Sequence, residues 1–128
     1  MIVVDTSAIV AVMLKEPTRE RLADVIARAD ACTISPVTLT EATMVLSRTF
    51  RNAKLAIDTY LQGTGITVGS IDAAQAELAR DAFLSFGKGR HAARLNIGDC
   101  FAYAAAKALN APLLFVGDDF AKTDIRAA

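Results

Sequence analysis

The sequence predicts a single α/β domain built around a short-stranded parallel sheet. A length of 128 residues suits one compact domain. The chain opens on a wholly apolar, β-branched run, Ile2–Val4, which is typical of a strand covered on both faces. Similar short runs then alternate with stretches of helical periodicity, as expected when helices connect parallel strands. No repeat or linker interrupts this order, so we expect residues 1–128 to form one domain.

The expected elements follow from apolar spacing and from the residues that begin or end helices. Strands are predicted at residues 2–4, 32–35, 66–68 and 113–116. Helices are predicted at residues 8–14, 17–29, 36–50, 53–61, 72–86 and 99–109. Pro17 and Pro36 stand in first turns, where proline is tolerated, while Asn110 and Pro112 end the last helix.

Composition limits the function and the compartment. Fourteen basic and fourteen acidic side chains cancel, so a nucleic-acid site has to be a local patch. Cys32 and Cys100 stand in apolar stretches and are interpreted as buried thiols rather than a disulfide or a metal site. We expect a reducing, cytoplasmic location without membrane association, because there is no signal peptide and no apolar run of about 20 residues.

Acidic residues follow two of the predicted strands. Asp5 comes directly after the first strand, and Asp118 and Asp119 follow the last strand after one glycine. The carboxyl ends of parallel strands form the edge at which open α/β sheets bind ligands. The sequence therefore predicts that these carboxylates meet at one edge of the sheet.

Two further acids lie on predicted helices among apolar neighbours. Glu41 shares its helix face with Val37 and Met44, and a lone carboxylate facing a core is unfavourable unless it is paired or bound to a cation. Asp99 poses the same problem, because Ala102, Tyr103 and Ala106 occupy its side of the last helix.

Each acid taken singly has a plain structural explanation. Asp5 can end a strand and begin a turn, Asp99 resembles a helix N-cap, and residues 118–119 can form an acidic turn. Glu41 would need a basic partner, and Arg48, on its side of the helix, is two turns away. Only the four positions together indicate a site.

Carboxylates that converge without basic partners repel one another, and a hard divalent cation such as Mg²⁺ or Mn²⁺ relieves the repulsion. The chemistry that fits is phosphodiester hydrolysis by a metal-activated water. His91 is the only histidine, which excludes a paired-histidine ribonuclease and a histidine-rich zinc site. There is also no phosphate-binding glycine loop and no dinucleotide motif.

Four short motifs resemble those of PIN-domain ribonucleases of the VapC toxin family, in the same order. They are residues 1–8 (MIVVDTSA), 38–41 (TLTE), 96–100 (NIGDC) and 117–120 (GDDF), and residues 123–125 (TDI) match an ending common in one branch. The resemblance covers essentially the whole chain. It implies a three-layer α/β sandwich and an Mg²⁺-dependent endoribonuclease that acts as the toxin of a toxin–antitoxin module.

The resemblance also implies roles for the acids. Asp5 and Asp99 would be the principal ligands of Mg²⁺, for which Mn²⁺ could substitute. Glu41 would complete the pocket directly, or through a water that it orients or deprotonates. Asp119 matches the fourth acid better than Asp118, whose role stays open.

Thr6 and Ser7 would support this site by a hydrogen bond to a ligand or to the substrate, and Ser7 is preferred. Family membership further implies RNA as substrate, a VapB-type antitoxin that covers the acidic pocket, and a homodimer. It does not select which RNA is cut, nor one metal ion over two.

A basic loop precedes the Asp99 motif. Residues 87–94 contain Lys88, Arg90 and Arg94 beside His91 and no acid. A solvated loop explains this composition as well as RNA contact does. Its nearness to Asp99 leads us to expect that the three basic residues contact the phosphate backbone.

Two other functions fit parts of the pattern. One is a phosphatase or phosphotransferase with Asp5 as nucleophile, although Ser7 stands where such enzymes commonly carry a second acid. The other is a PIN-like scaffold that binds RNA or a partner without catalysis. Such a scaffold would be expected to lose acids, and all four positions are acidic here.

Overall fold

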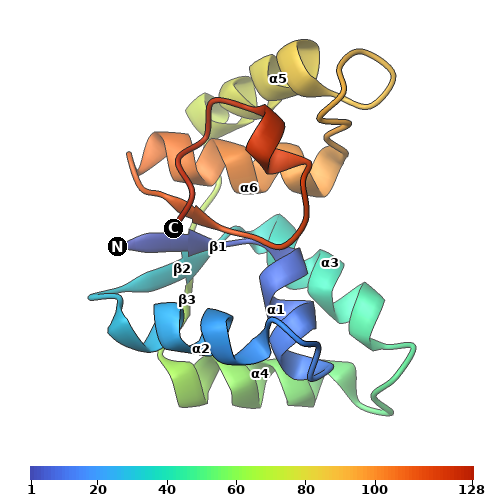
Figure 1. Ribbon diagram of the computed structural model, residues 1–128, viewed down its shortest axis with the longest axis vertical. Helices are drawn as coiled ribbons and strands as arrows, with labels where there is room; N and C mark the ends of the chain where they lie inside the picture. The colour runs from blue at the N-terminus through green and yellow to red at the C-terminus, as the bar shows by residue number, and fades with distance from the viewer.

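A four-stranded parallel sheet lies between two layers of helices in the computed structural model, which describes all residues 1–128 (Figure 1). The strands are β1 (Ile2–Val4), β2 (Cys32–Ile34), β3 (Thr67–Val68) and β4 (Leu113–Leu114), in the order β3-β2-β1-β4. The helices are α1 (Thr6–Met13), α2 (Arg19–Arg28), α3 (Pro36–Leu46), α4 (Ala53–Thr64), α5 (Ala73–Phe86), α6 (Ile97–Ala108) and the 3₁₀ turn η1 (Phe120–Lys122).

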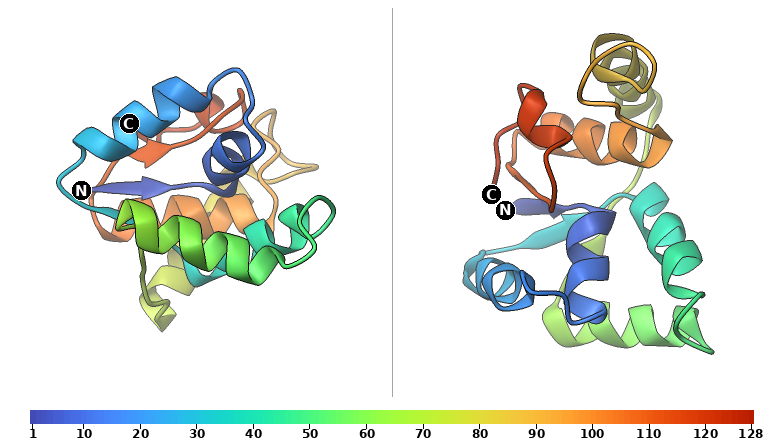
Figure 2. Two further views of the ribbon diagram at one scale, coloured as in Figure 1. Left: turned by 90° about the horizontal axis from the view of Figure 1, so that it is seen from below. Right: turned by 45° about the vertical axis from the view of Figure 1, so that its right-hand side comes forward.

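Side chains of the sheet alternate between two hydrophobic cores, because successive residues of a strand point to opposite faces. Val4 and Leu114 pack with α1, α2, α3 and α4, whereas Val3 and Leu113 pack with α5 and α6. Figure 2 shows the sheet between these two groups of helices. The predicted three-layer α/β sandwich is confirmed.

The strand order places a topological switch point between β1 and β4. β1 pairs with β2 on one side and with β4 on the other, all in parallel. The chain therefore builds outward through β2 and β3 before it returns to the far side of β1. Ligands of open α/β sheets bind outside the carboxyl ends of strands at such a point, and here these ends lead into Asp5 and into residues 117–119.

The predicted elements are confirmed apart from their ends. The last helix begins at Ile97 and is capped by Asn96, so the interpretation of Asp99 as its N-cap is wrong. The last strand stops at Leu114, because the backbone N–H of Val116 donates to the Ser7 hydroxyl instead of continuing the sheet. Cys32 and Cys100 are buried free thiols, as expected.

The carboxyl-terminal segment returns along the free side of β4. The N–H of Leu113 donates to Arg126 O, and the N–H of Ala128 donates to Leu113 O. These bonds cover an edge strand that would otherwise expose unpaired backbone groups. None of the helices combines the length and the apolar character needed to cross a membrane.

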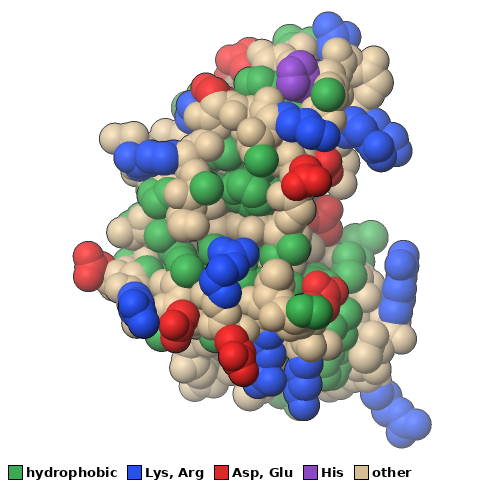
Figure 3. All heavy atoms as spheres, in the orientation of Figure 1, with side chains coloured by type: hydrophobic (Ala, Val, Ile, Leu, Met, Phe, Trp, Pro, Cys, Tyr) green, Lys and Arg blue, Asp and Glu red, His purple; other side chains and the backbone are tan.

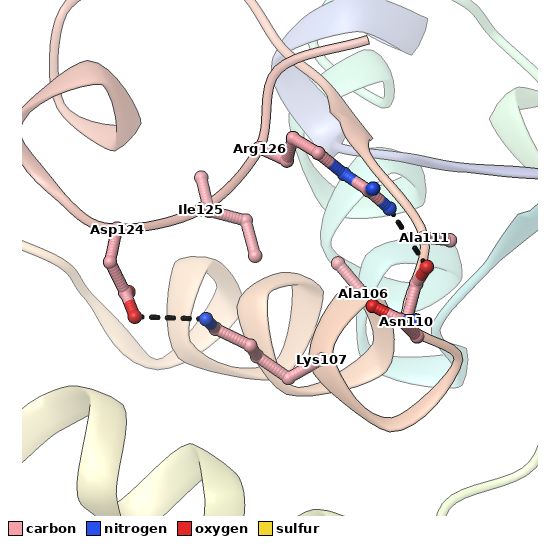
Figure 4. Close-up of a pocket in the computed structure, with 7 residues that line it drawn as sticks. All are labelled: Ala106, Lys107, Asn110, Ala111, Asp124, Ile125 and Arg126. Carbon is pink, nitrogen blue, oxygen red and sulfur yellow. Dashed lines mark hydrogen bonds and ion pairs between the residues drawn. The ribbon is translucent and has the colours of Figure 1, made fainter.

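Side chains of α6 hold the same segment (Figure 4). The Asp124 carboxylate accepts from the Lys107 ammonium at 2.8 Å. It also accepts from the Tyr103 hydroxyl at 2.6 Å. These two bonds keep the pKa of Asp124 below its usual value. The Arg126 guanidinium donates to Asn110 O at 2.8 Å. The segment that follows Asp119 is thereby attached to the helix that carries Asp99.

Candidate active site

Asp5 connects β1 to α1 and caps the helix. Its Oδ2 accepts from the Ser7 backbone N–H at 3.0 Å and from the Ser7 hydroxyl at 2.6 Å. Its Oδ1 is buried and has no hydrogen-bond partner. Asp5 is only 3% exposed, and desolvation raises its pKa although the bonds from Ser7 oppose the shift.

Ser7 joins the ends of the two strands that carry acids. Its hydroxyl donates to Asp5 and accepts from the N–H of Val116, which follows β4, at 3.0 Å. The hydroxyl hydrogen is thus already used within the protein. In this conformation Ser7 orients Asp5 rather than donating to a ligand.

Glu41 reaches from α3 toward the first turns of α1 and α6. The Thr6 hydroxyl donates to Glu41 Oε1 at 2.5 Å. On the other side the carboxyl group lies against Gly98, where an added Cβ would overlap it. The expectation that Glu41 shares a buried apolar face is wrong, because Met44, one turn further along α3, is 67% exposed.

Asp99 is the third residue of α6 and forms a capping box with Asn96. Its backbone N–H donates to Asn96 Oδ1, and its Oδ2 accepts from the Asn96 backbone N–H at 3.0 Å. Desolvation, followed by the negative charges of Asp5, Glu41 and Asp119, raises the pKa of Asp99 to about 6, against the bond from Asn96. Asp119 is thus one of the three carboxylates whose charges are among the largest causes of this shift.

The fold therefore gathers the four favoured acids around the switch point, where the charges of Asp5, Glu41 and Asp119 act on Asp99. The donor set consists of oxygen atoms only, and the buried Oδ1 of Asp5 has no partner, which fits a hard divalent cation. In the conformation described, no three acidic, histidine or cysteine side chains already have the arrangement of a metal site.

We expect Asp99→Asn to stabilise the metal-free protein above pH 6, the region of the raised pKa. Asp99 binds its proton at a higher pH in the folded protein than in the unfolded chain. The charged carboxylate therefore destabilises the folded state above the raised pKa, and this destabilisation disappears as the pH falls toward about 4. Allowing for solvent screening at this partly exposed group, the gain is about 1–2 kcal/mol. Asparagine keeps an oxygen for the capping bond, so the comparison isolates the charge.

Urea unfolding of both proteins with a chelator, at pH 8 and at pH 5, measures this difference. An equal difference between the two proteins at both pH values would contradict the assignment of a destabilising charge to Asp99.

The basic loop lies between α5 and α6 and is closed by backbone bonds. Lys88 N–H donates to Leu95 O, and Leu95 N–H donates to Phe86 O. Lys88, Arg90 and Arg94 are all exposed, and none of them forms an ion pair. In Figure 3 basic side chains gather at the upper right, directly above acidic ones. The loop thus carries three exposed positive charges without an ion pair, and it leads directly into the helix that carries Asp99.

Comparison with known proteins decides the family. Residues 2–126 match the PIN domain model, and the chain is 40% identical over 126 residues to ribonuclease VapC of Mycolicibacterium smegmatis, with 98% of each chain covered. This chain is a PIN-domain protein of the VapC family. It is also 39% identical over 124 residues to ribonuclease VapC30 of Mycobacterium tuberculosis, covering 96% of this chain and 95% of the relative. The family resemblance predicted from the motifs is confirmed.

Solved structures share the fold of this VapC-family protein. VapC20 of Mycobacterium tuberculosis, a sarcin–ricin-loop-cleaving toxin, superposes with a TM-score of 0.79 at 19% identity, covering 100% of this chain and 98% of that one. VapBC2 of Rickettsia felis, bound to a promoter DNA fragment, gives 0.77 at 16% identity, with the same coverage. At these identities the likeness concerns the fold alone.

Sequence reasoning missed two features of this VapC-family protein. The contact between Gly98 and Glu41 joins α6 to α3, and the only local signal for it is a glycine within the first turn of a helix, next to an acid. The attachment of Asp124 to Tyr103 and Lys107 had a weaker signal, the spacing of four residues that puts these two donors on one face of α6.

Proposed function

We propose that this VapC-family protein is an Mg²⁺-dependent endoribonuclease and the toxin of a toxin–antitoxin module. The observation that carries the proposal is the convergence of Asp5, Glu41 and Asp119 on Asp99, since the negative charges of these three carboxylates all raise its pKa. The proposal is also supported by relatives that are about 40% identical over nearly the whole chain and are named ribonucleases.

Asp5 and Asp99 would hold the cation, with Glu41 and Asp119 completing the pocket. Asp5 and Asp99 each use Oδ2 to bind a backbone N–H at a helix N-terminus, which fixes the carboxyl group and leaves Oδ1. A bound divalent cation would supply Lewis-acid stabilisation of the phosphoryl group and would lower the pKa of water. Mn²⁺ would substitute for Mg²⁺, because both prefer oxygen ligands.

Glu41 would orient the attacking water and accept its proton. The Thr6 hydroxyl holds Oε1 from the side of α1, and Oε2 lies against Gly98, so the carboxylate keeps one direction toward the attacking water. Thr6 and Ser7 thus act through the carboxylates that they hold. This assignment differs from the expected hydrogen bond to a ligand, because both hydroxyl hydrogens are donated within the protein.

An Asp5-nucleophile phosphotransferase gains no support from the geometry. Asp5 Oδ2 is engaged by Ser7, and Ser7 stands where such enzymes commonly carry a second acid. A scaffold without catalysis is also less favoured, because it gives no reason for keeping four unpaired acids together.

RNA would be the substrate, and a VapB-type antitoxin would be the partner. A toxin–antitoxin complex of Klebsiella pneumoniae shares the fold with a TM-score of 0.74 and 16% identity, as does VapBC2 of Rickettsia felis. We propose that the antitoxin covers the acidic pocket and that the toxin forms a homodimer, as the family resemblance implies.

Sequencing RNA fragments from cells that express the protein tests the proposed function. New 5′ ends should accumulate at a small set of sites with the wild-type chain and should be absent with Asp99→Asn expressed at the same level. If both proteins give the same fragment pattern, the chain is not the nuclease.

Lys88→Ala and Arg90→Ala should weaken RNA binding and reduce its dependence on salt. Each phosphate contact that is lost lowers the slope of log K against log salt by about 1. The measurement is RNA affinity of the Asp99→Asn protein, which binds without cutting, over a range of NaCl concentrations. Arg51→Ala and Lys54→Ala, at the start of α4 in the opposite layer, serve as controls. An unchanged slope in the loop variants would exclude the loop from RNA binding.

A further inference from the structure

The Glu41 carboxyl group occupies the place where a side chain at position 98 would begin. A Cβ built on Gly98 would overlap the carboxyl carbon and both oxygens of Glu41, and these are its three nearest atoms. Gly98 itself is buried within the first turn of α6. No residue other than glycine can therefore stand here while Glu41 keeps its position.

The position is also electrostatically suited to a carboxylate. The first turn of an α-helix has backbone N–H groups without intrahelical partners and carries partial positive charge. Glu41 meets this turn on one side and the Thr6 hydroxyl on the other. The carboxyl group is thus held between the starts of α1 and α6, next to the residue that carries the Asp99 carboxylate.

We propose that Gly98 is a positioning residue for Glu41: its missing side chain makes the space that keeps the Glu41 carboxylate beside Asp99. The inference rests on the proposed ribonuclease for its catalytic consequence, but the contact itself does not depend on that function. The space lies beside the backbone of α6, so a side chain introduced at position 98 would displace Glu41, which belongs to α3.

Gly98→Ala should move Glu41 without unfolding the protein. The overlapping atoms are the end of a flexible side chain, which can turn away from α6 and give up its bond with Thr6. Because a shift of about 1 Å in a catalytic group can lower the rate about 100-fold, we expect kcat for RNA cleavage to fall about 10- to 100-fold with little change in KM.

Gly63→Ala is the matched control. Gly63 lies in α4, no atom is within 4 Å of an added Cβ, and its φ is not positive. Alanine is the better helix former, so this variant should have a raised Tm and wild-type cleavage. It separates the effect of a helical glycine from the effect of the contact with Glu41.

Shortening the side chain at position 41 should offset the effect of Gly98→Ala. Glu41→Asp withdraws the carboxylate by one methylene and should lower cleavage in the wild-type background. In the Gly98→Ala background the same change should cost nothing or raise cleavage, because aspartate no longer meets the alanine. Multiplicative effects of the two substitutions would overturn the proposal.

The Tm of the metal-free protein gives a readout that needs neither RNA nor metal. Gly98→Ala should raise the Tm in the Glu41→Ala background, as Gly63→Ala does, and should raise it less or lower it when Glu41 is present. Equal shifts in the two backgrounds would exclude the contact. If the two backgrounds give different Tm shifts but the protein never cuts RNA, the contact between Gly98 and Glu41 is supported and the proposed function is contradicted.

Discussion

Asp99→Asn is expected to lower RNA cleavage by at least about 100-fold while the protein stays folded. Substitution of groups that merely support metal ligands already lowers affinity or activity about 10- to 100-fold, and Asp99 is itself a proposed ligand. The amide can still accept the capping bond from Asn96, so the helix should keep its first turn. The measurement is single-turnover cleavage of an RNA substrate at saturating MgCl₂, together with circular dichroism.

Asp118→Asn is the control for this substitution. Asp118 neighbours Asp119, but only Asp119 is among the largest causes of the raised pKa of Asp99, so we expect close to wild-type cleavage. Asp119→Asn should resemble Asp99→Asn. Full activity of Asp99→Asn would remove this residue from the site, and an inactive Asp118→Asn would add Asp118 to it.

Removal of divalent cations should lower cleavage to the level of the Asp99→Asn protein. The charges of Asp5, Glu41 and Asp119 repel that of Asp99, and Mg²⁺ or Mn²⁺ added after chelation should relieve this repulsion and restore the activity. A cation that binds only the folded state also stabilises it, by about 2.7 kcal/mol at 100 times its Kd. Thermal unfolding with EDTA or with MgCl₂, at matched ionic strength, measures this effect.

The Asp99→Asn protein separates specific binding from a general salt effect. Its Tm should respond to MgCl₂ much less than that of the wild type. Cleavage that persists undiminished in EDTA would exclude the metal-dependent mechanism, whereas an equal Tm response in both proteins would place the cation elsewhere.

Local pattern was enough to predict the elements and the class of the fold. Ile2–Val4 is too short and too apolar for an exposed strand, and the helices that follow carry regular apolar spacing, so a parallel sheet with helical crossovers was the expected arrangement. The ends of elements depended on contacts with distant residues. β4 stops early because Val116 bonds to Ser7, which lies 109 residues earlier in the chain.

Part of the candidate site was also predictable from the sequence, and part of it was not. That Asp5 and the acids after β4 meet was predictable, because the carboxyl ends of parallel strands share one edge. The environment of Glu41 was predicted wrongly, because helical periodicity places Met44 on its face but does not tell which face is buried. The preference for Asp119 over Asp118 rested on a motif and stays a prediction, and the charge of Asp119 is among those that raise the pKa of Asp99.

Sequence by itself determined the family, the parallel sheet and the four acidic positions, because these follow from residue type, short-range order and spacing along the chain. Tertiary structure decided which atoms hold each carboxylate: Ser7 on Asp5, Thr6 and Gly98 on Glu41, and Asn96 on Asp99. The physical reason is that a carboxylate's direction and pKa depend on neighbours within a few ångströms. For Glu41 these neighbours come from α1 and α6, 35 and 57 residues away along the chain.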